Sequence, residues 1–355
     1  MPNVSAFITS PRYRPVEELV VGNTVVAGRF GEVGQEYRAA REGAALFDRG
    51  DRGLLILTGA DRTSWLQNLV TNDVAGLAEN AGTYAFATDV KGRVVFDLNV
   101  LALRDALWLD IDRALIPRAL AHLERFLISE DVRMRDASAE FSRLGWSGPG
   151  AGGIAEALGF AAAADMPAQS SAALEGDGTR LVRHDFTGLP GYELIVPFAQ
   201  AAAWWDRLVA AGAAPAGFHV LDAMRIEAGI PWFGREIDEK VVAPEADPAG
   251  CGISYKKGCY LGQEVIERMR SRGVQARRLV RLRASPAVAL DLPADLRKGG
   301  QTVGRITSLV RHPVEPVGVG LGYVGSSVCD LCGIECDAST ELWVSEVDAH
   351  SVMCR

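Results

Sequence analysis

Residues 256–264 read KKGCYLGQE and place two ammonium groups, a thiol, a phenol, an amide and a carboxylate within nine residues. Two glycines stand among them, and glycine lets a backbone adopt positive φ and approach a ligand closely. The next residues, 265–270, read as a short helix. We therefore expect a polar turn that leads into a helix N-terminus, where free N–H groups and the helix dipole favour anions. The alternative is an ordinary solvated turn.

A second dense stretch, residues 225–238, reads RIEAGIPWFGREID. Arg225 lies at the end of an expected helix, where a guanidinium is suited to hold a carboxylate through two hydrogen bonds. The simpler alternative is a cation that stabilises the C-terminus of its own helix. Upstream, residues 186–197 read FTGLPGYELIVP, which predicts a Gly/Pro turn followed by a strand that carries Glu193.

Residues 84–103 predict a β-hairpin whose turn spans 89–93. Side chains alternate along a strand, so Asp97 and Asn99 fall on one face of the returning strand. Phe96 falls on the opposite face. This places one carboxylate and one amide together on the polar side of the hairpin.

Together these stretches resemble the YgfZ-type folate-binding proteins, which share a superfamily with the T-protein of glycine cleavage, an aminomethyltransferase. The resemblance implies an α+β, aminomethyltransferase-like folate-binding fold with a C-terminal antiparallel β-barrel. It implies tetrahydrofolate as cofactor, and it assigns Asp97, Glu193, Arg225 and Lys257 to one folate cleft. The implied function is support for the assembly or repair of iron–sulfur enzymes, including tRNA-modifying ones, and these enzymes would be the partners.

The same resemblance makes Cys259 the expected catalytic residue. A neighbouring ammonium group and a helix N-terminus lower the pKa of a thiol and so favour the reactive thiolate. In the T-protein two adjacent aspartates stand where this chain has Phe96 and Asp97. The single carboxylate argues against aminomethyl transfer, which we keep as the alternative function.

Other features bound the class of protein. The 355 residues carry a net charge of −8, yet nine bases and only two acids lie between Lys256 and Arg283. This basic segment raises a third alternative, an RNA-binding module, but it lacks the aromatic motif of such modules, so direct RNA binding is not expected. Cys329, Cys332 and Cys336, with Cys354 as a fourth ligand, have a spacing that suits a metal, although we expect no metal site here.

The remaining expectations concern organisation. Strand signals at short spacing begin at 277, which predicts a small antiparallel barrel over 276–355. The resemblance implies that residues 1–275 form the folate-binding region, with two interleaved subdomains. No apolar run reaches the 18 or so residues that a membrane-spanning helix needs. The N-terminus lacks the basic-then-apolar layout of a signal peptide, so we expect a cytoplasmic protein without membrane partners.

Overall fold

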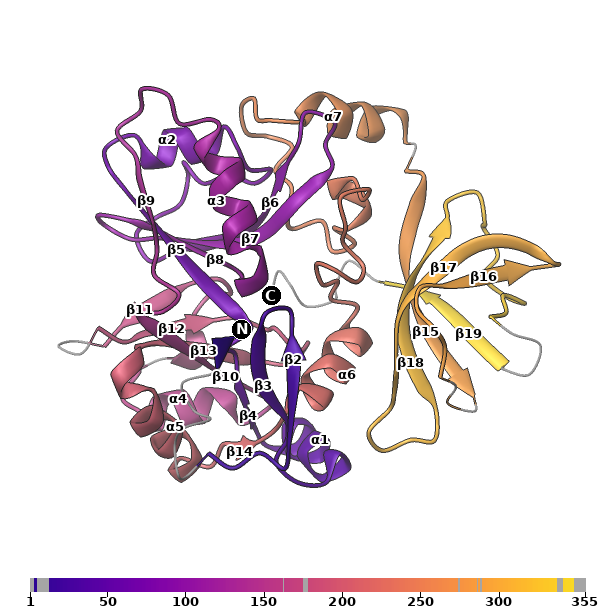
Figure 1. Ribbon diagram of the computed structural model, residues 1–355, viewed down its shortest axis with the longest axis horizontal. Helices are drawn as coiled ribbons and strands as arrows, with labels where there is room; N and C mark the ends of the chain where they lie inside the picture. Colours follow the sequence, from indigo (N-terminus) through magenta and orange to yellow (C-terminus); the bar gives the residue numbers. More distant parts are fainter. Residues whose placement is uncertain are drawn as a thin grey trace.

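The computed structural model describes residues 3–4, 13–161, 163–174, 178–273, 275–285, 287, 289–336 and 341–347. Figure 1 shows two sheets, one above the other in this view, and a third sheet in orange and yellow that stands beside them. The mixture of helices and strands agrees with the expected α+β class. Within the described ranges, no helix is both long enough and apolar enough to cross a membrane.

The upper sheet in Figure 1 has five antiparallel strands in the order β6-β7-β8-β5-β9. The strand bounds are β5 Arg52–Thr58, β6 Gly82–Thr88, β7 Val94–Ala102, β8 Leu107–Asp112 and β9 Arg133–Asp136. One face of this sheet is apolar, and it packs against α2 (Arg62–Gln67) and α3 (Ile116–Glu124). Side-chain alternation leaves Asp97 and Asn99 on the other face.

The predicted hairpin is formed by β6 and β7. Its turn is closed by the Asp89 carboxylate, which accepts hydrogen bonds from the backbone N–H groups of Lys91 and Arg93. This is the local role for which aspartate is favoured in turns. Gly92 has a φ of 72°, a conformation that a side chain would disfavour. The turn therefore sets the register that brings Tyr84 opposite Asn99.

The lower sheet has six strands in the order β11-β12-β13-β10-β4-β14, and only β14 pairs in parallel. The bounds are β4 Ala45–Asp48, β10 Phe141–Ser147, β11 Ser171–Ala173, β12 Arg180–Arg183, β13 Gly191–Pro197 and β14 Ala214–Pro215. An apolar core that includes Trp146 and Trp204 joins this sheet to α4 (Ala151–Ala157) and α5 (Ala201–Ala210). A second core that includes Phe47 joins it to the helices α1 (Val33–Glu42) and α6 (Phe218–Ala228).

The remaining elements of this larger part are short or lie at its edge. A small sheet has the order β1-β3-β2. The bounds are β1 Asn3–Val4, β2 Glu17–Val21, β3 Thr24–Arg29, α1 Val33–Glu42, α6 Phe218–Ala228, η1 Arg113–Leu115, η2 Ala163–Asp165, η3 Phe198–Gln200 and η4 Ala243–Glu245, where η denotes a 3₁₀ helix.

The third sheet is antiparallel throughout and has the order β16-β17-β18-β15-β19. The bounds are β15 Arg277–Ser285, β16 Ala294–Lys298, β17 Gln301–Arg311, β18 Gly318–Gly325 and β19 Glu341–Glu346. We expected a barrel here, but no pairing in the described ranges joins the edge strands β16 and β19, so we describe a five-stranded sheet. One of its faces packs on Ile226 of α6.

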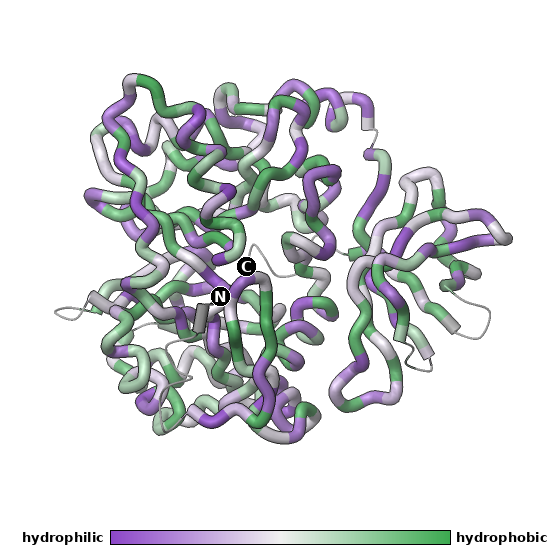
Figure 2. The backbone as a smooth tube through the Cα atoms, viewed as in Figure 1, coloured by the Kyte–Doolittle hydropathy of each residue, from purple (hydrophilic) through white to green (hydrophobic). Residues whose placement is uncertain are grey.

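The stretch 256–264 leads into α7 (Gln263–Arg272), as predicted. Gly262, just before the helix, has a φ of 84°, and a Cβ there would lie 2.5 Å from the carbonyl oxygen of Asp89. This position therefore requires glycine for two independent reasons. Most residues of this helix are hydrophilic, as the purple in Figure 2 shows, and Ile266 is its only buried residue.

Candidate functional site

A pocket lies between the polar face of the upper sheet and the end of α6, and we call it the Asp97 pocket. It encloses about 630 Å³ of empty space, part of which is open to solvent. Its polar lining consists of Arg49, Arg52, Asp97, Asn99, Asp112, His184 and Arg225, and its aromatic and apolar lining consists of Tyr84, Phe186, Leu221, Ile230, Pro231 and Trp232. Sequence segments that are far apart therefore meet at one cavity, as sites for small molecules commonly do.

Asp97 reaches the pocket from the middle of β7. The Tyr84 hydroxyl donates a hydrogen bond of 3.0 Å to Asp97 Oδ2. Burial raises the pKa of Asp97 above its ordinary value, and the charge of Arg52 and the Tyr84 hydrogen bond oppose this only in part. The carboxyl group is thus suited to exchange a proton nearer to neutral pH than an exposed aspartate would be.

Phe96 does not remove a carboxylate from this pocket. Its side chain is fully buried in the apolar core between the upper sheet and its helices. Strand alternation points residue 96 away from the face that carries Asp97. The absence of a second aspartate therefore leaves the chemistry of the pocket unchanged, and the argument from Phe96 against aminomethyl transfer was wrong.

Asn99 supplies a buried acceptor that has no partner. Its Nδ2 donates to Asp110 Oδ2 over 3.0 Å, which fixes the amide orientation because a carboxylate only accepts. Its Oδ1 is buried and has no hydrogen-bond partner among the described residues. Leaving such an atom unsatisfied costs free energy, and a donor on a bound molecule would remove that cost.

Glu193 lies one layer behind the pocket wall. It is 1% exposed, and Arg49 NH1 and Arg143 NH1 approach its carboxylate at 2.8 and 3.2 Å. His184 Nδ1 lies 3.0 Å from the same carboxylate and donates to it. Burial alone would raise the pKa of Glu193, but the two arginines and His184 outweigh it and hold the pKa well below the ordinary value. Glu193 therefore orients Arg49 and His184 and does not itself line the pocket.

Arg225 lines the pocket, but most of its hydrogen-bond donors are already used. Its Nε donates to Asp222 over 2.8 Å, its NH1 to Glu236 over 2.5 Å, and its NH2 to Ser308 over 2.9 Å. These partners come from α6, from the loop after it and from β17 of the C-terminal sheet. The guanidinium thus connects these three elements of the pocket wall through hydrogen bonds. Trp232 in the same wall donates through Nε1 to Asp112 over 2.8 Å.

Lys257 lies outside the lining of the Asp97 pocket. Its Nζ donates to the backbone carbonyls of Gln67, Val70 and Asn72 over 2.5, 2.7 and 2.8 Å. Burial lowers the pKa of this ammonium to about 8. The side chain therefore ties the turn after α2 to the stretch 256–264. Of the four residues that we assigned to one folate cleft, the structure places Asp97 and Arg225 in the wall, Glu193 behind it and Lys257 elsewhere.

The cysteines that the structure describes are also separate from the Asp97 pocket. Cys259 is an exposed free thiol on the turn before α7. Cys329 and Cys332 are exposed free thiols, and Cys336 is partly buried. Cys354 lies outside the described residues. Across the part of the chain that is described, no three His, Cys, Asp or Glu residues are close enough to hold a metal ion.

The arginines of β15, which raised the RNA-binding alternative, are engaged by the protein itself. Arg281 NH1 donates to the carbonyl of Glu227 over 3.1 Å. The others form ion pairs, namely Arg277 with Glu245, Arg278 with Glu346 and Arg283 with Glu315. All four guanidinium groups are therefore engaged within the protein.

Sequence reasoning missed Tyr84, His184 and Trp232. Tyr84 could have been predicted from the sequence, because the turn at 89–93 sets the hairpin register and places Tyr84 beside Asp97. His184 follows β12 of the other sheet, and Trp232 lies on the loop after α6. No local pattern connects either of these residues with β7, so only the assembled fold brings them to the pocket.

Comparison with known proteins shows close relatives over most of the chain. An aminomethyltransferase of Geobacillus kaustophilus is 30% identical over 315 residues, which is 85% of this chain and 85% of the relative. An aminomethyltransferase of Rubrobacter xylanophilus is 29% identical over 301 residues, 83% of this chain and 80% of the relative. The crystal structure of the glycine cleavage system aminomethyltransferase T from Bartonella henselae superposes with a TM-score of 0.87 at 18% identity, covering 100% of this chain and 99% of that one. The latter shows a shared fold.

These findings correct the expected function. Support for the assembly or repair of iron–sulfur enzymes is overturned, because relatives that cover more than four fifths of this chain carry the name aminomethyltransferase. That name is the function we kept as the alternative. The assignment of Cys259 as the catalytic residue rested on the overturned function. The comparisons support the wider T-protein superfamily and do not show a YgfZ-type protein.

The sequence profile of the family described as "GCVT N-terminal domain" matches residues 11–251. This range contains the upper and lower sheets and every residue that lines the Asp97 pocket. Because the match spans more than half of the chain, the protein belongs to the GCVT N-terminal domain family.

Proposed function

We propose that this protein is a tetrahydrofolate-dependent aminomethyltransferase and that the Asp97 pocket binds the folate. The observation that carries this proposal is a partly buried carboxylate with a raised pKa beside an unpartnered, buried amide oxygen in a pocket with aromatic walls. The names of the relatives support the same activity. Members of this family are folate-dependent, which agrees with the proposed cofactor.

The residues of the pocket fit a reduced pterin. A pterin presents adjacent N–H donors on a flat ring, and Asn99 Oδ1 and the Asp97 carboxylate are acceptors on one strand face. Phe186 and Trp232 provide aromatic surface for stacking. Tetrahydrofolate bound here would supply the two nucleophilic nitrogens that take over the one-carbon unit, while the bonds of that carbon to ammonia and to the lipoyl sulfur break and ammonia and the free thiol are released.

The chain's own groups then have distinct roles. Asp97, through its unshared Oδ1, would hold or release a proton at the reacting nitrogen and would stabilise positive charge there. Tyr84 fixes the orientation of that carboxyl group through Oδ2. Arg52, held by Asp110 at 2.9 Å, moderates the pKa of Asp97 through its charge.

The test is an assay of ammonia release from an aminomethylated lipoyl carrier protein, run together with a titration of tetrahydrofolate. Asp97→Asn keeps the size of the side chain and should lower the transfer rate by about 10²–10⁴-fold. Asp105→Asn is the matched control, because Asp105 is exposed on the turn between β7 and β8. Equal rates for the two variants, or wild-type protein that binds no tetrahydrofolate, would exclude the proposed site.

A further inference from the structure

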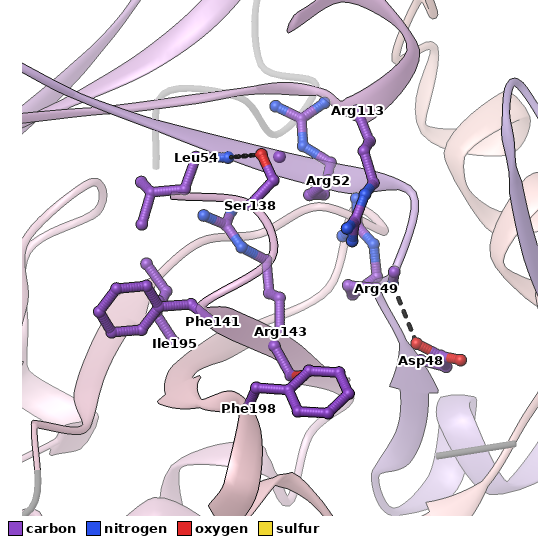
Figure 3. Close-up of a pocket in the computed structure, with 13 residues that line it drawn as sticks. Asp48, Arg49, Arg52, Leu54, Arg113, Ser138, Phe141, Arg143, Ile195 and Phe198 are labelled. Carbon is purple, nitrogen blue, oxygen red and sulfur yellow. Dashed lines mark hydrogen bonds between the residues drawn. The ribbon is translucent and has the colours of Figure 1, made fainter. Parts of the chain in front are cut away.

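A second pocket lies against the same layer of arginines, and we call it the arginine pocket. It encloses about 500 Å³ of empty space, part of it open to solvent. Figure 3 shows its lining, in which the guanidinium groups of Arg49, Arg52, Arg113 and Arg143 lie on one side and Phe141, Phe198 and Ile195 on the other. Arg49 and Arg52 also line the Asp97 pocket, whereas Arg113 and Arg143 do not.

Three of the four arginines are anchored by carboxylates. Arg49 is held by Asp51 and Glu193, and its Nε, NH1 and NH2 all donate. Arg52 donates through Nε and NH2 to Asp110, which leaves NH1 without an acceptor among the described residues. Arg143 donates to carboxylates through NH1 alone. The layer is therefore rigidly placed, and it keeps spare N–H donors.

Arg113 is the exception in this layer. Among the described residues its side chain has neither a hydrogen bond nor an ion pair, although it is half-buried. The carboxylates that act on it electrostatically are those of Asp136 and Asp48, and neither lies within ion-pair distance. Asp48 is engaged elsewhere, because it accepts hydrogen bonds from the Tyr13 hydroxyl and the Gly50 N–H. Burial without a partner lowers the pKa of Arg113 below its ordinary value.

A partly buried guanidinium without a counter-ion is unfavourable unless something else supplies the negative charge. The residues around Arg113 are suited to bind a ligand that supplies this negative charge. Ser138 accepts a hydrogen bond from the Leu54 N–H and keeps its own hydroxyl proton to donate. The planar fork of a guanidinium matches the two oxygens of a carboxylate or phosphate. Phe198, which is 52% exposed, offers an apolar surface at the edge of the pocket.

We propose that the arginine pocket is an oxyanion-binding site, distinct from the folate site, in which Arg113 is the principal ligand of a carboxylate or phosphate group. Arg143 and Ser138 supply further donors, and Phe141 and Phe198 receive an apolar part when the anion carries one. The site does not depend on the proposed transfer activity, because Arg113 does not contact the Asp97 pocket.

Titration calorimetry of the full chain at constant ionic strength tests this site, with inorganic phosphate and benzoate as probes. We expect one saturable site, weakened about tenfold or more in Arg113→Gln and partly restored in Arg113→Lys. Arg38→Gln is the matched control, because Arg38 is exposed on α1 and is not part of the lining. Tighter binding of benzoate than of phosphate identifies an organic carboxylate as the ligand, and the reverse order identifies a phosphate.

Two further measurements separate this site from the folate site. Asp97→Asn should leave phosphate and benzoate binding unchanged, and Arg113→Gln should leave tetrahydrofolate binding unchanged. The proposal is overturned if wild-type protein binds neither probe, if Arg38→Gln weakens binding as much as Arg113→Gln does, or if tetrahydrofolate displaces the probes competitively. If the thermal melt shows that Arg113→Gln does not fold, Ser138→Ala replaces it. Ser138→Ala should weaken the binding of both probes by a smaller factor, and unchanged binding of the probes to this variant would overturn the proposal.

Discussion

Replacing Lys257 by Met is expected to lower the free energy of unfolding by about 2–4 kcal/mol. The ammonium group donates to three backbone carbonyls, and methionine leaves those of Gln67, Val70 and Asn72 without that donor. Each hydrogen bond to a charged group contributes about 1.5–3 kcal/mol. Burial of the ammonium, which lowers its pKa to about 8, works against this gain, so the net loss is smaller than the sum of three bonds.

Lys256→Met is the matched control, because the neighbouring side chain is exposed and makes no hydrogen bond or ion pair with the described residues. It should change the free energy of unfolding by less than about 0.5 kcal/mol. Urea denaturation of both variants measures the difference, and a tetrahydrofolate titration of the same samples tests ligand binding. Equal stability of the two variants would refute the structural role. Loss of folate binding at unchanged stability would show that Lys257 contacts the folate instead.

Three further predictions concern the strand β7 and the charges behind it. Asp97→Asn should stabilise the protein at pH 7, because burial raises the pKa of Asp97. The carboxyl group therefore contributes its full stability to the folded state only below the unfolded pKa of about 3.9, and that stability is lost as pH rises through the folded pKa. Thermal melts at pH 4 and 7 check this, and a less stable variant at pH 7 would contradict it. Glu193→Gln should cost about 3–5 kcal/mol at pH 7. Because the pKa of Glu193 is held low, the stability lost in this variant should shrink as pH falls below about 4.3. Denaturation at several pH values measures this loss, and a loss that does not change with pH would contradict the ion-pair explanation. Phe96→Asp should destabilise by at least about 3 kcal/mol without raising the transfer rate, and a stable, more active variant would show that residue 96 reaches the pocket.

Local patterns predicted the two polar groups that the returning strand of the hairpin carries to the site, although not Tyr84 on the other strand. The alternation along β7 placed Asp97 and Asn99 on one face, and the turn at Asp89 fixed the register with β6. The glycine before α7 and the helix itself also followed from residues that are adjacent in sequence. For such elements the determining contacts span a few residues, so a single stretch contains the necessary information.

Long-range electrostatics could not be predicted in the same way. Glu193 and Lys257 were expected to bind a ligand because their side chains are chemically suited to it. In the structure Glu193 is saturated by Arg49, which is 144 residues away, and Lys257 by the carbonyl of Gln67, which is 190 residues away. A charged side chain in a dense motif can equally serve the fold, and only its three-dimensional partners distinguish the two uses.

The cluster around Arg225 has a consequence for how the chain can be divided. The hydroxyl of Ser308 accepts from Arg225 NH2 and donates to Glu236 over 2.5 Å, and Thr307 also donates to Glu236. Both hydroxyls belong to β17, beyond the expected boundary at 275. A chain that ends at residue 275 would keep a buried guanidinium and carboxylate but lose the hydroxyl groups that complete their hydrogen bonds. The C-terminal sheet is therefore part of the scaffold of the pocket, and the two regions should melt in one cooperative transition.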